Sequence, residues 1–371
     1  VDISEFNTLI SNCKITKYDI IDVHREVLRI TKALKSFLSN SKTLEFDEKL
    51  TQYLSEYNNK HFPVPDFKYK LRKGEIDEKQ YGYKKEREFL NVFQELIDKY
   101  EINHIQEKSD KFIDKWYLKP IREEIEYVYK EISKVTNQNT KNLVSLILSR
   151  TMRSCRATTH ADLATLIEPV TAPYYCSKHG KICKPLFTIL KWWETYSKDT
   201  LKRVLEFDKL RTSTNQICLT GDSRSINITD ELYRINPSFA KLVSEQKIKG
   251  IFSSPPYVGL IDYHEQHAYA YDLFGFRRRD ELEIGPLFKG QSKEARESYV
   301  ESIASVLLNC KRFLANDYHV FLVANDKYNL YPIIAEKSGM KIVNQFKRPV
   351  LNRTEKDKGA YSEIIFHLRG K

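Results

Sequence analysis

The residues best suited to chemistry in this sequence are Ser254-Pro255-Pro256-Tyr257, which directly follow an apolar run from Gly250 to Ser253. Consecutive prolines fix the backbone and remove two N–H donors, so nearby carbonyls stay free to accept hydrogen bonds. A serine hydroxyl and a rigid carbonyl can hold both hydrogens of an amine and leave its lone pair directed outward. The tyrosine ring offers a face for stacking a planar base. Taken alone, these four residues could equally form a Pro-Pro turn with a core tyrosine.

The tetrad lies in a segment that alternates strand-like and helix-like runs. A short apolar run from Gln216 to Thr220 ends in Gly221-Asp222, and helical patterns cover Ser298 to Leu314 and Leu330 to Lys337, the second ending at Gly339 as a plausible C-cap. Further strand-like runs are Tyr318 to Ala324, Lys341 to Phe346 and Ser362 to Leu368, with a polar hairpin from Asn352 to Gly359. This order predicts an α/β sheet with an antiparallel edge strand. The tetrad would lie at the carboxyl end of a strand, where open α/β sheets place their sites.

The remainder of the chain divides into two zones. Residues 1–40 combine a strand-like start with helical runs from Ser4 to Lys14 and from Ile20 to Leu38. Residues 41–210 are rich in Lys, Glu, Tyr and Leu, and their helical patterns cover Lys84 to Tyr100, Asp110 to Val135, Asn142 to Arg153 and Leu186 to Leu210. The pattern leaves open whether this zone packs on the rest of the protein or contacts a partner.

Composition narrows the class of protein. The chain has 371 residues, of which 41% are hydrophobic and 12% aromatic, so a sizeable core is expected. The formal net charge of +11 suits a polyanionic partner, although a solvated Lys- and Glu-rich surface would give the same excess. No run is long and apolar enough to span a membrane, and no signal peptide opens the chain. Six cysteines are too sparse for a disulfide scaffold, which favours a reducing, cytoplasmic location.

Three segments, in order and spacing, resemble the DNA methyltransferases that modify exocyclic base amines. Ser254 to Tyr257 resembles their catalytic motif, in which Asp, Asn or Ser precedes Pro-Pro and an aromatic residue. Leu219 to Ser223 resembles the Gly-Asp-Ser segment upstream of that motif, and Gly259 to Glu265 resembles the segment after it in one branch of the family. The resemblance implies S-adenosylmethionine as cofactor, a Rossmann-like sheet, duplex DNA as substrate and a target base flipped out of the helix. It implies cofactor contacts at Asp222, Ser223 and Ser253, with the Asp222 carboxylate beside the adenine.

The beginning of the chain looks like the second cofactor motif of the same family. In that motif a strand ends in an acidic residue that holds the ribose hydroxyls, a position that Asp2 matches, with Glu5 as a less favoured substitute. The family's first motif, a Gly-rich turn, has no counterpart here, because the chain contains no Gly-x-Gly pair. We therefore expect a sheet that lacks its first strand, and an upstream segment or subunit that carries the turn. On this interpretation residues 1–40 begin the catalytic domain, 41–210 form a helical insertion that is a possible target-recognition module, and 211–371 form the catalytic core.

The tetrad also indicates the target base. Serine in its first position is more usual in enzymes that methylate N4 of cytosine, whereas aspartate predominates among N6-adenine enzymes, so the resemblance favours cytosine. No cysteine nucleophile is needed, and the absence of a Pro-Cys pair agrees, since carbon-5 methylation of cytosine requires one. The expected setting is restriction–modification, with a possible cognate endonuclease. The alternatives are an N6-adenine enzyme, an RNA or protein-glutamine amine methyltransferase, and a non-catalytic DNA-binding subunit.

Other groups of residues carry weaker indications. Basic side chains expected to meet DNA phosphates are Arg150, Arg153 and Arg156, spaced three apart on one helix face, and, in loops on the rim of Tyr257, Arg277, Arg278, Lys347, Arg348 and Arg353. His264 and Glu265 are candidates for the wall of the base pocket. Cys176, His179 and Cys183, with His160 and Cys155 upstream, have the residue types for zinc. Their spacing is not that of a standard finger, and buried thiols in a tight loop are the simpler account, so we predict no metal site from the sequence.

Overall fold

The protein was analysed as a computed structural model that describes residues 1–371 except 40, 107–108, 161–165 and 351–360. The described chain separates into two compact units. Unit 1 comprises residues 1–12, 213–271 and 275–371, and unit 2 comprises residues 13–212 and 272–274. The predicted insertion zone therefore lies within unit 2, together with helix α2 (Ile20–Ser39), which the sequence pattern had grouped with the start of the catalytic domain.

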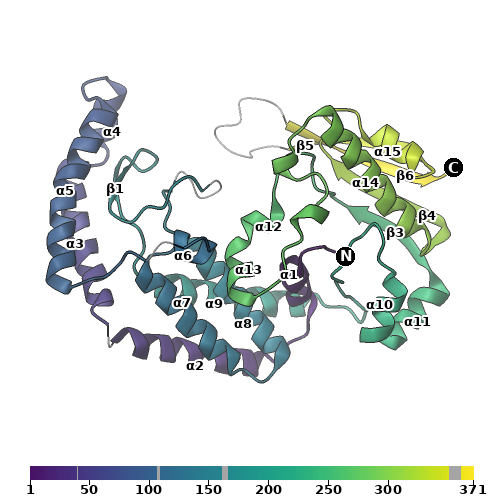
Figure 1. Cartoon of the computed structure of the whole chain (residues 1–371), viewed down its shortest axis with the longest axis horizontal. Helices are drawn as coiled ribbons and strands as arrows, with labels where there is room; N and C mark the ends of the chain where they lie inside the picture. The colour runs from purple at the N-terminus through teal and green to yellow at the C-terminus, as the bar shows by residue number, and fades with distance from the viewer. Residues whose placement is uncertain (40, 107–108, 161–165, 351–360) are drawn as a thin grey trace. The chain divides into compact units, whose positions relative to one another are not determined.

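Unit 1 is built on a four-stranded sheet in the order β3-β4-β6-β5 (Figure 1). Its strands are β3 (Ile248–Ser253), β4 (Leu314–Ala324), β5 (Met340–Val350) and β6 (Tyr361–Gly370). Strands β3 and β4 are parallel, whereas β6 runs antiparallel to both β4 and β5. The predicted closing antiparallel pair is present at one edge of the sheet, but its reversed member, β6, lies between β4 and β5 and not at the edge itself. A helix connects β4 to β5 and leaves a gap one strand wide, which the antiparallel β6 fills, so the edge strand on that side is β5.

Helices of unit 1 cover this sheet through a single apolar cluster. Helix α14 (Lys293–Lys311) buries Tyr299, Ile303 and Leu307 at helical spacing, and α15 (Tyr331–Lys337) packs beside it. Phe366 of β6 stacks on Tyr331, with 4.8 Å between ring centroids. Gly339 follows α15 in the left-handed conformation expected of a residue just beyond a helix end. The other elements of this part of the chain are α1 (Glu5–Ile15), at which the division between the units falls, α10 (Ile228–Ile235), α11 (Pro237–Gln246), α12 (Tyr263–Gln266), α13 (Ala268–Phe274) and short 3-10 turns at Asp280–Leu282 and Leu287–Lys289.

The described residues of unit 2 form helices, one short hairpin and the loops between them. Its helices are α2 (Ile20–Ser39), α3 (Thr43–His61), α4 (Asp66–Arg72), α5 (Glu78–Tyr100), α6 (Phe112–Trp116), α7 (Lys119–Ser133), α8 (Gln138–Ser154) and α9 (Leu190–Asp208), and its hairpin joins β1 (Tyr174–Cys176) to β2 (Lys181–Cys183). The helix predicted from Asp110 to Val135 is in fact two helices, because the chain is extended at Tyr117 and Leu118 before Pro120 begins the next turn. None of the helices in the described ranges is both long and apolar enough to cross a membrane.

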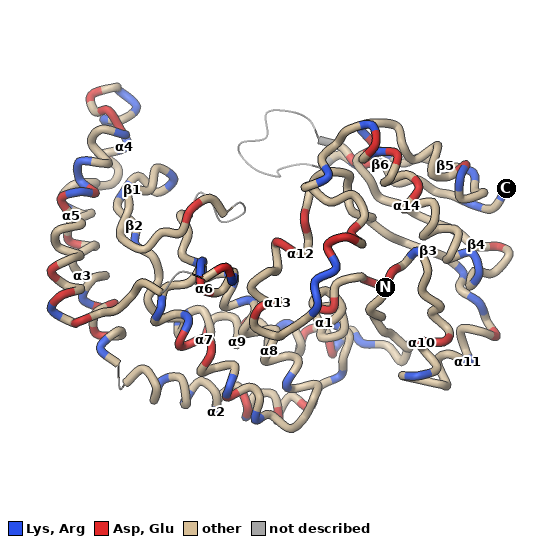
Figure 2. The backbone as a smooth tube through the Cα atoms, viewed as in Figure 1, with Lys and Arg blue, Asp and Glu red and all other residues tan. Residues whose placement is uncertain are grey.

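The helices of unit 2 pack together through apolar stripes, and the outer faces of these helices are charged. Helix α2 buries Val23, Val27, Ile30, Leu34 and Leu38 along one face. Trp193 of α9 is fully buried, and its indole N–H donates to the Thr31 hydroxyl of α2 at 2.8 Å. On α3 and α5 acidic and basic residues alternate (Figure 2).

One buried carboxyl gives unit 2 a pH dependence. Glu124 of α7 is almost fully buried and accepts hydrogen bonds from the Ile189 backbone N–H at 2.8 Å and the Thr188 hydroxyl at 3.0 Å. Burial raises the pKa of Glu124 to about 8, because two neutral donors do not replace the lost water. The side chain therefore folds in its protonated form at neutral pH.

We predict that the free energy of unfolding of unit 2 decreases as pH rises from about 4.3, the carboxyl pKa of an unfolded chain, to about 8. The folded state binds more protons than the unfolded state in this window, so the slope is at most about 1.4 kcal/mol per pH unit. Glu124→Gln should remove this part of the pH dependence. The three tryptophans, Trp116, Trp192 and Trp193, all lie in unit 2, so urea unfolding followed by tryptophan fluorescence reports this unit.

The matched control is Glu95→Gln, which changes an exposed carboxyl on helix α5 of the same unit. The free energy of unfolding of this control should change with pH at the same slope as that of the wild type. Equal slopes for the wild type and Glu124→Gln would contradict a protonated Glu124.

Candidate functional site

The tetrad Ser254 to Tyr257 begins where β3 ends. Because β3 pairs in parallel with β4, the tetrad lies at the carboxyl end of a parallel pair of strands. Gly259, just beyond the tetrad, has a φ of 63°, and its backbone N–H donates to the carbonyl of Gly285 at 3.0 Å. A Cβ atom at this position would come within 2.5 Å of the Gly290 carbonyl oxygen, so only glycine fits here.

A backbone bridge brings the beginning of the chain to the same region of unit 1. Asp2 and Thr220 form a parallel bridge, in which the Asp2 N–H donates to the Leu219 carbonyl at 3.0 Å and the Gly221 N–H donates to the Asp2 carbonyl at 2.9 Å. The predicted strand from Gln216 to Thr220 is reduced to this single bridge. The turn at Gly221-Asp222 therefore starts beside Asp2.

A cavity of about 260 Å³ in unit 1 gathers the predicted residues. Asp2, Asp222, Ser223, Ser254 and Pro256 all line it, although they come from three separate stretches of the sequence. Its other lining residues are Val1, Ile3, Ser4, Asn7, Tyr263, His264, Leu282, Glu283 and Ile284. Glu5, Ser253, Pro255 and Tyr257, which the sequence also indicated, do not line it.

The Tyr257 side chain is anchored to the sheet. Its hydroxyl donates to Glu363 Oε1 of β6 at 2.8 Å, and Arg348 of β5 donates to Glu363 Oε2 at 3.0 Å. Glu363 therefore joins the last residue of the tetrad to a basic side chain on the neighbouring strand. The sequence analysis missed Glu363, because only the strand order places it beside Tyr257.

The walls of the cavity are acidic. The Asp2 carboxylate accepts the backbone N–H of Ser4 at 2.8 Å and is within reach of the Asn7 amide, which fixes it at the start of α1. The Asp222 carboxylate forms an ion pair with Arg224 at 2.7 Å. Burial alone would raise the pKa of Asp222, but the hydrogen bonds and charge of Arg224 outweigh it and lower this pKa below its ordinary value. Asp222 is thus ionised at neutral pH.

A buried histidine and glutamate form another part of the wall. His264 is fully buried, and its backbone N–H donates to Glu283 Oε1 at 2.7 Å, while its ring Nδ1 contacts the same oxygen. Its Nε2 has no hydrogen-bond partner among the described residues. Glu265, paired with His264 in the sequence analysis, is exposed instead and accepts from Arg278 at 3.0 Å. Glu283 lies in a loop with no recognisable motif, so it could not be identified from the sequence.

The predicted phosphate-binding residues are dispersed. Arg150 forms an ion pair with Asp199 and lies over the Tyr196 ring, both within unit 2. Arg156 lies beyond the end of α8, so Arg150, Arg153 and Arg156 do not share one helix face. Lys347 and Arg348 lie on strand β5 instead of in a loop. Arg153, Arg277 and Lys347 are exposed. Arg278 pairs with Asp280 as well as Glu265, and Arg353 lies outside the described residues.

The remaining candidates, Cys176, His179 and Cys183, lie together in unit 2, and His160 lies with them, whereas Cys155 is buried elsewhere and is not part of the group.

Comparison with known proteins places this chain in a family. No family model matches the sequence, and no solved structure matches it. The chain is similar to the Type II methyltransferase M.MjaII of Methanocaldococcus jannaschii, with 47% identity over 374 aligned residues that cover 100% of this chain and 70% of the relative. An identity this high over the whole of the chain shows common descent, and the chain therefore belongs to the family of Type II methyltransferases.

Proposed function

We propose that the chain is an S-adenosylmethionine-dependent DNA methyltransferase of a restriction–modification system, and that it modifies the exocyclic amine of a flipped base, N4 of cytosine. The observation that carries this proposal is the cavity of unit 1. It gathers the acid expected at the cofactor ribose, the acid expected at the cofactor adenine and the serine of the tetrad around one space. Membership of the Type II methyltransferase family supports the same reaction class.

The charge of the cavity suits this cofactor. S-adenosylmethionine supplies, when bound, an electrophilic methyl group on a positively charged sulfur. Three carboxylates, those of Asp2, Asp222 and Glu283, line the walls and favour a cationic ligand rich in hydrogen-bond donors. In the proposal Asp2 accepts from the ribose hydroxyls, while Asp222 and Ser223 lie beside the adenine. Ser253 would contribute through its backbone at the end of β3, since its side chain does not line the cavity.

The tetrad would hold the base. The Ser254 hydroxyl and a carbonyl of the Pro-Pro segment accept hydrogen bonds from the two amine hydrogens, which directs the nitrogen lone pair at the methyl group. Positive charge would develop on the nitrogen as it takes the methyl group from the sulfonium, whose sulfur would keep the bonding electrons and become neutral. The same two acceptors would stabilise this charge until a proton of the amine passes to solvent. The Tyr257 ring, fixed by its bond to Glu363, offers a stacking surface for the flipped base. No cysteine lines the described cavity, which agrees with direct attack by the amine.

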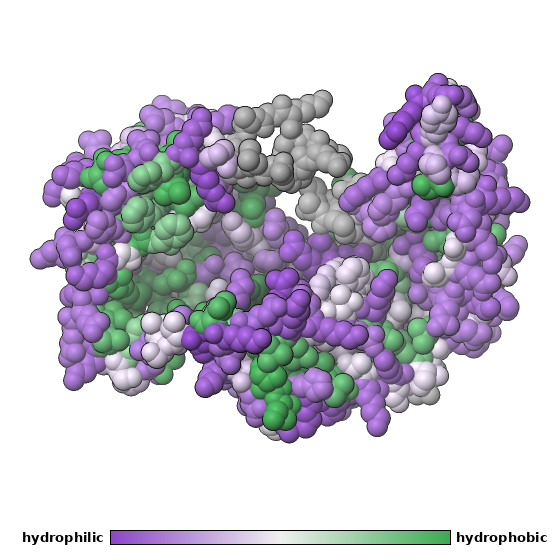
Figure 3. Space-filling model, turned by 180° about the vertical axis from the view of Figure 1, so that it is seen from behind, coloured by the Kyte–Doolittle hydropathy of each residue, from purple (hydrophilic) through white to green (hydrophobic). Residues whose placement is uncertain are grey.

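The outer edge of β3 is where the predicted missing strand would lie. β3 has no strand beside it on that edge among the described residues, and Phe252 on it is 76% exposed. Seen from behind, the surface of unit 1 includes apolar areas (Figure 3). An additional strand that carries a Gly-rich turn would cover this edge and complete the cofactor site, from an upstream segment or from a partner subunit. The exposed Arg153, Arg277 and Lys347 remain proposed contacts to DNA phosphates.

We predict that Ser254→Ala lowers kcat for methyl transfer to duplex DNA about 10- to 100-fold, because the amine loses one of its two acceptors. Tyr257→Ala should weaken binding of the flipped base by about 1–3 kcal/mol, the usual contribution of one stacked base. Transfer of labelled methyl groups, with a segment that carries the Gly-rich turn supplied where binding requires it, measures both effects.

Ser238→Ala and Tyr233→Ala are the matched controls, since both side chains are exposed on helices α10 and α11, away from the tetrad. Both should keep the activity of the wild type. Unchanged transfer by Ser254→Ala would argue against the tetrad as the methylation site.

We predict that Arg224→Ala makes cofactor binding sensitive to acid. Without the guanidinium, only the backbone N–H at position 224 still opposes the effect of burial, so the pKa of Asp222 rises and the carboxylate becomes protonated at a higher pH than in the wild type. Calorimetric titration with S-adenosylmethionine should then show several-fold weaker binding at about pH 5 than at about pH 7.5, while the wild type changes little over this range. Arg234→Ala, which breaks the exposed pair with Glu231, is the control and should follow the wild type. A flat profile for Arg224→Ala would contradict the proposed role of the ion pair.

A further inference from the structure

The β1–β2 hairpin of unit 2 presents two cysteines on one face. Tyr174 is paired with Cys183 in the register, and Cys176 lies two residues beyond Tyr174 on the same strand. Residues opposite each other and residues two apart share a face of a β-ladder, so both thiols point to the same side. His179 lies in the tight turn between the strands, where the N–H groups of His179 and Gly180 both donate to the Cys176 carbonyl, at 3.1 and 2.7 Å.

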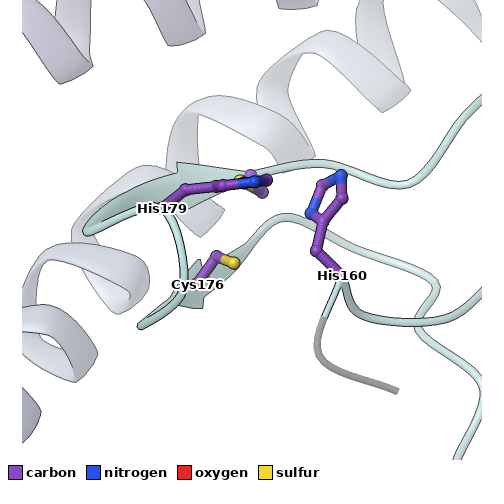
Figure 4. Close-up of side chains that lie close together, drawn as sticks. His160, Cys176 and His179 are labelled. Atoms are coloured by element: carbon purple, nitrogen blue, oxygen red, sulfur yellow. The ribbon is translucent and has the colours of Figure 1, made fainter. Parts of the chain in front are cut away.

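His160 completes the group from another part of unit 2. It belongs to the segment that follows α8, and its ring centroid lies 4.4 Å from that of His179. The side chains of His160, Cys176 and His179 converge (Figure 4). One ligand atom from each of His160, Cys176, His179 and Cys183 can be chosen so that all four lie within 4.8 Å of one another.

We propose that these four residues form a structural zinc site of the Cys2His2 type. Zinc binds thiolate sulfur at about 2.3 Å and imidazole nitrogen at about 2.0–2.1 Å, so neighbouring ligand atoms of a tetrahedral site lie roughly 3.3–3.8 Å apart. The distance from His179 Nδ1 to Cys183 Sγ is 3.4 Å, which is one edge of such a tetrahedron. With two sulfur and two nitrogen ligands the ion has no open position, which is characteristic of structural and not catalytic zinc.

The surroundings of His160 support this assignment. Tyr174 contacts His160 twice, since its hydroxyl lies 2.8 Å from Nδ1 and accepts the backbone N–H of His160 at 3.0 Å. Metal-bound histidines usually donate their second ring N–H to such a partner, which fixes the ring orientation. With Nδ1–H donating to Tyr174, the Nε2 lone pair of His160 is left for the ion.

The hairpin is itself anchored, so the ion would link two parts of unit 2. The Asn58 side chain of α3 forms two hydrogen bonds with the backbone of Ile182, at 2.9 and 3.0 Å. The Tyr175 backbone N–H donates to Glu86 of α5 at 2.7 Å. Zinc would thus tie the segment after α8 to a hairpin already fixed on α3 and α5. It lies in a different compact unit from the cavity and supplies no group to it.

Metal content and cobalt substitution of the whole chain test this proposal. Protein expressed in zinc-supplemented medium and purified without chelators should contain one zinc per chain by elemental mass spectrometry. Replacement by Co²⁺ should give the intense visible bands of tetrahedral cobalt and the near-ultraviolet charge-transfer band of a cobalt–thiolate bond. Both measurements use the wild-type protein, so neither of them requires that a variant folds.

Variants then assign the ligands. Cys176→Ser and Cys183→Ser should each lose the stoichiometric metal or reduce the charge-transfer band by about half, whereas His179→Cys should keep the metal and increase that band. Cys310→Ser, outside the group, should leave both readouts unchanged. Protein without zinc, a cobalt spectrum that is not tetrahedral, or a spectrum that Cys176→Ser leaves unaltered would overturn the proposal.

Discussion

The site of unit 1 depends on one short backbone pairing, the parallel bridge between Asp2 and Thr220. Residues that are far apart in the sequence meet there, and the two hydrogen bonds of the bridge place Asp2 next to the turn that carries Asp222. The bridge has the geometry of parallel strands, whose carboxyl ends point to the same edge, so both acids reach one cavity. Between the two bridged stretches, Cys13–Thr212 belongs to the second compact unit, together with Asp272–Phe274.

The net charge of the chain and the charge of the cavity suit two different ligands of a DNA methyltransferase, its DNA and its cofactor. The chain as a whole carries a formal charge of +11, which favours a polyanion at its surface. The cavity, in contrast, is lined by three carboxylates and by His264, whose Nδ1 is engaged with Glu283. Such a cavity repels phosphate and attracts a sulfonium, so DNA and cofactor would be directed to different surfaces. Tyr257 lies outside the lining of the cavity, and its link through Glu363 to Arg348 joins the acidic site to a basic side chain of the sheet.

The sequence predicted what depends on local pattern and missed what depends on pairing between distant segments. Ser254 to Tyr257 follow a strand, as expected, because an apolar run before two prolines defines its own end. The position of β6 between β4 and β5 was not predicted, since strand order is fixed by a helical crossover that leaves a gap and not by the residues of β6. Glu283 and Glu363 were missed because single acids in a loop or strand carry no periodic signal. The predicted arginine stripe does not form because α8 ends at Ser154, two residues before Arg156.

In the proposed reaction, the amine of a flipped base attacks the methyl donor in the cavity lined by Asp2, Asp222 and Ser254. This reaction is tested most directly by nucleoside mass analysis of duplex DNA incubated with labelled S-adenosylmethionine and this chain, with a segment that carries the Gly-rich turn supplied. The account predicts N4-methylcytosine, and N6-methyladenine would keep the mechanism while correcting the base. 5-Methylcytosine would contradict the account, because that reaction requires a cysteine nucleophile. Absence of any methylated nucleoside would contradict the assignment of DNA as the substrate.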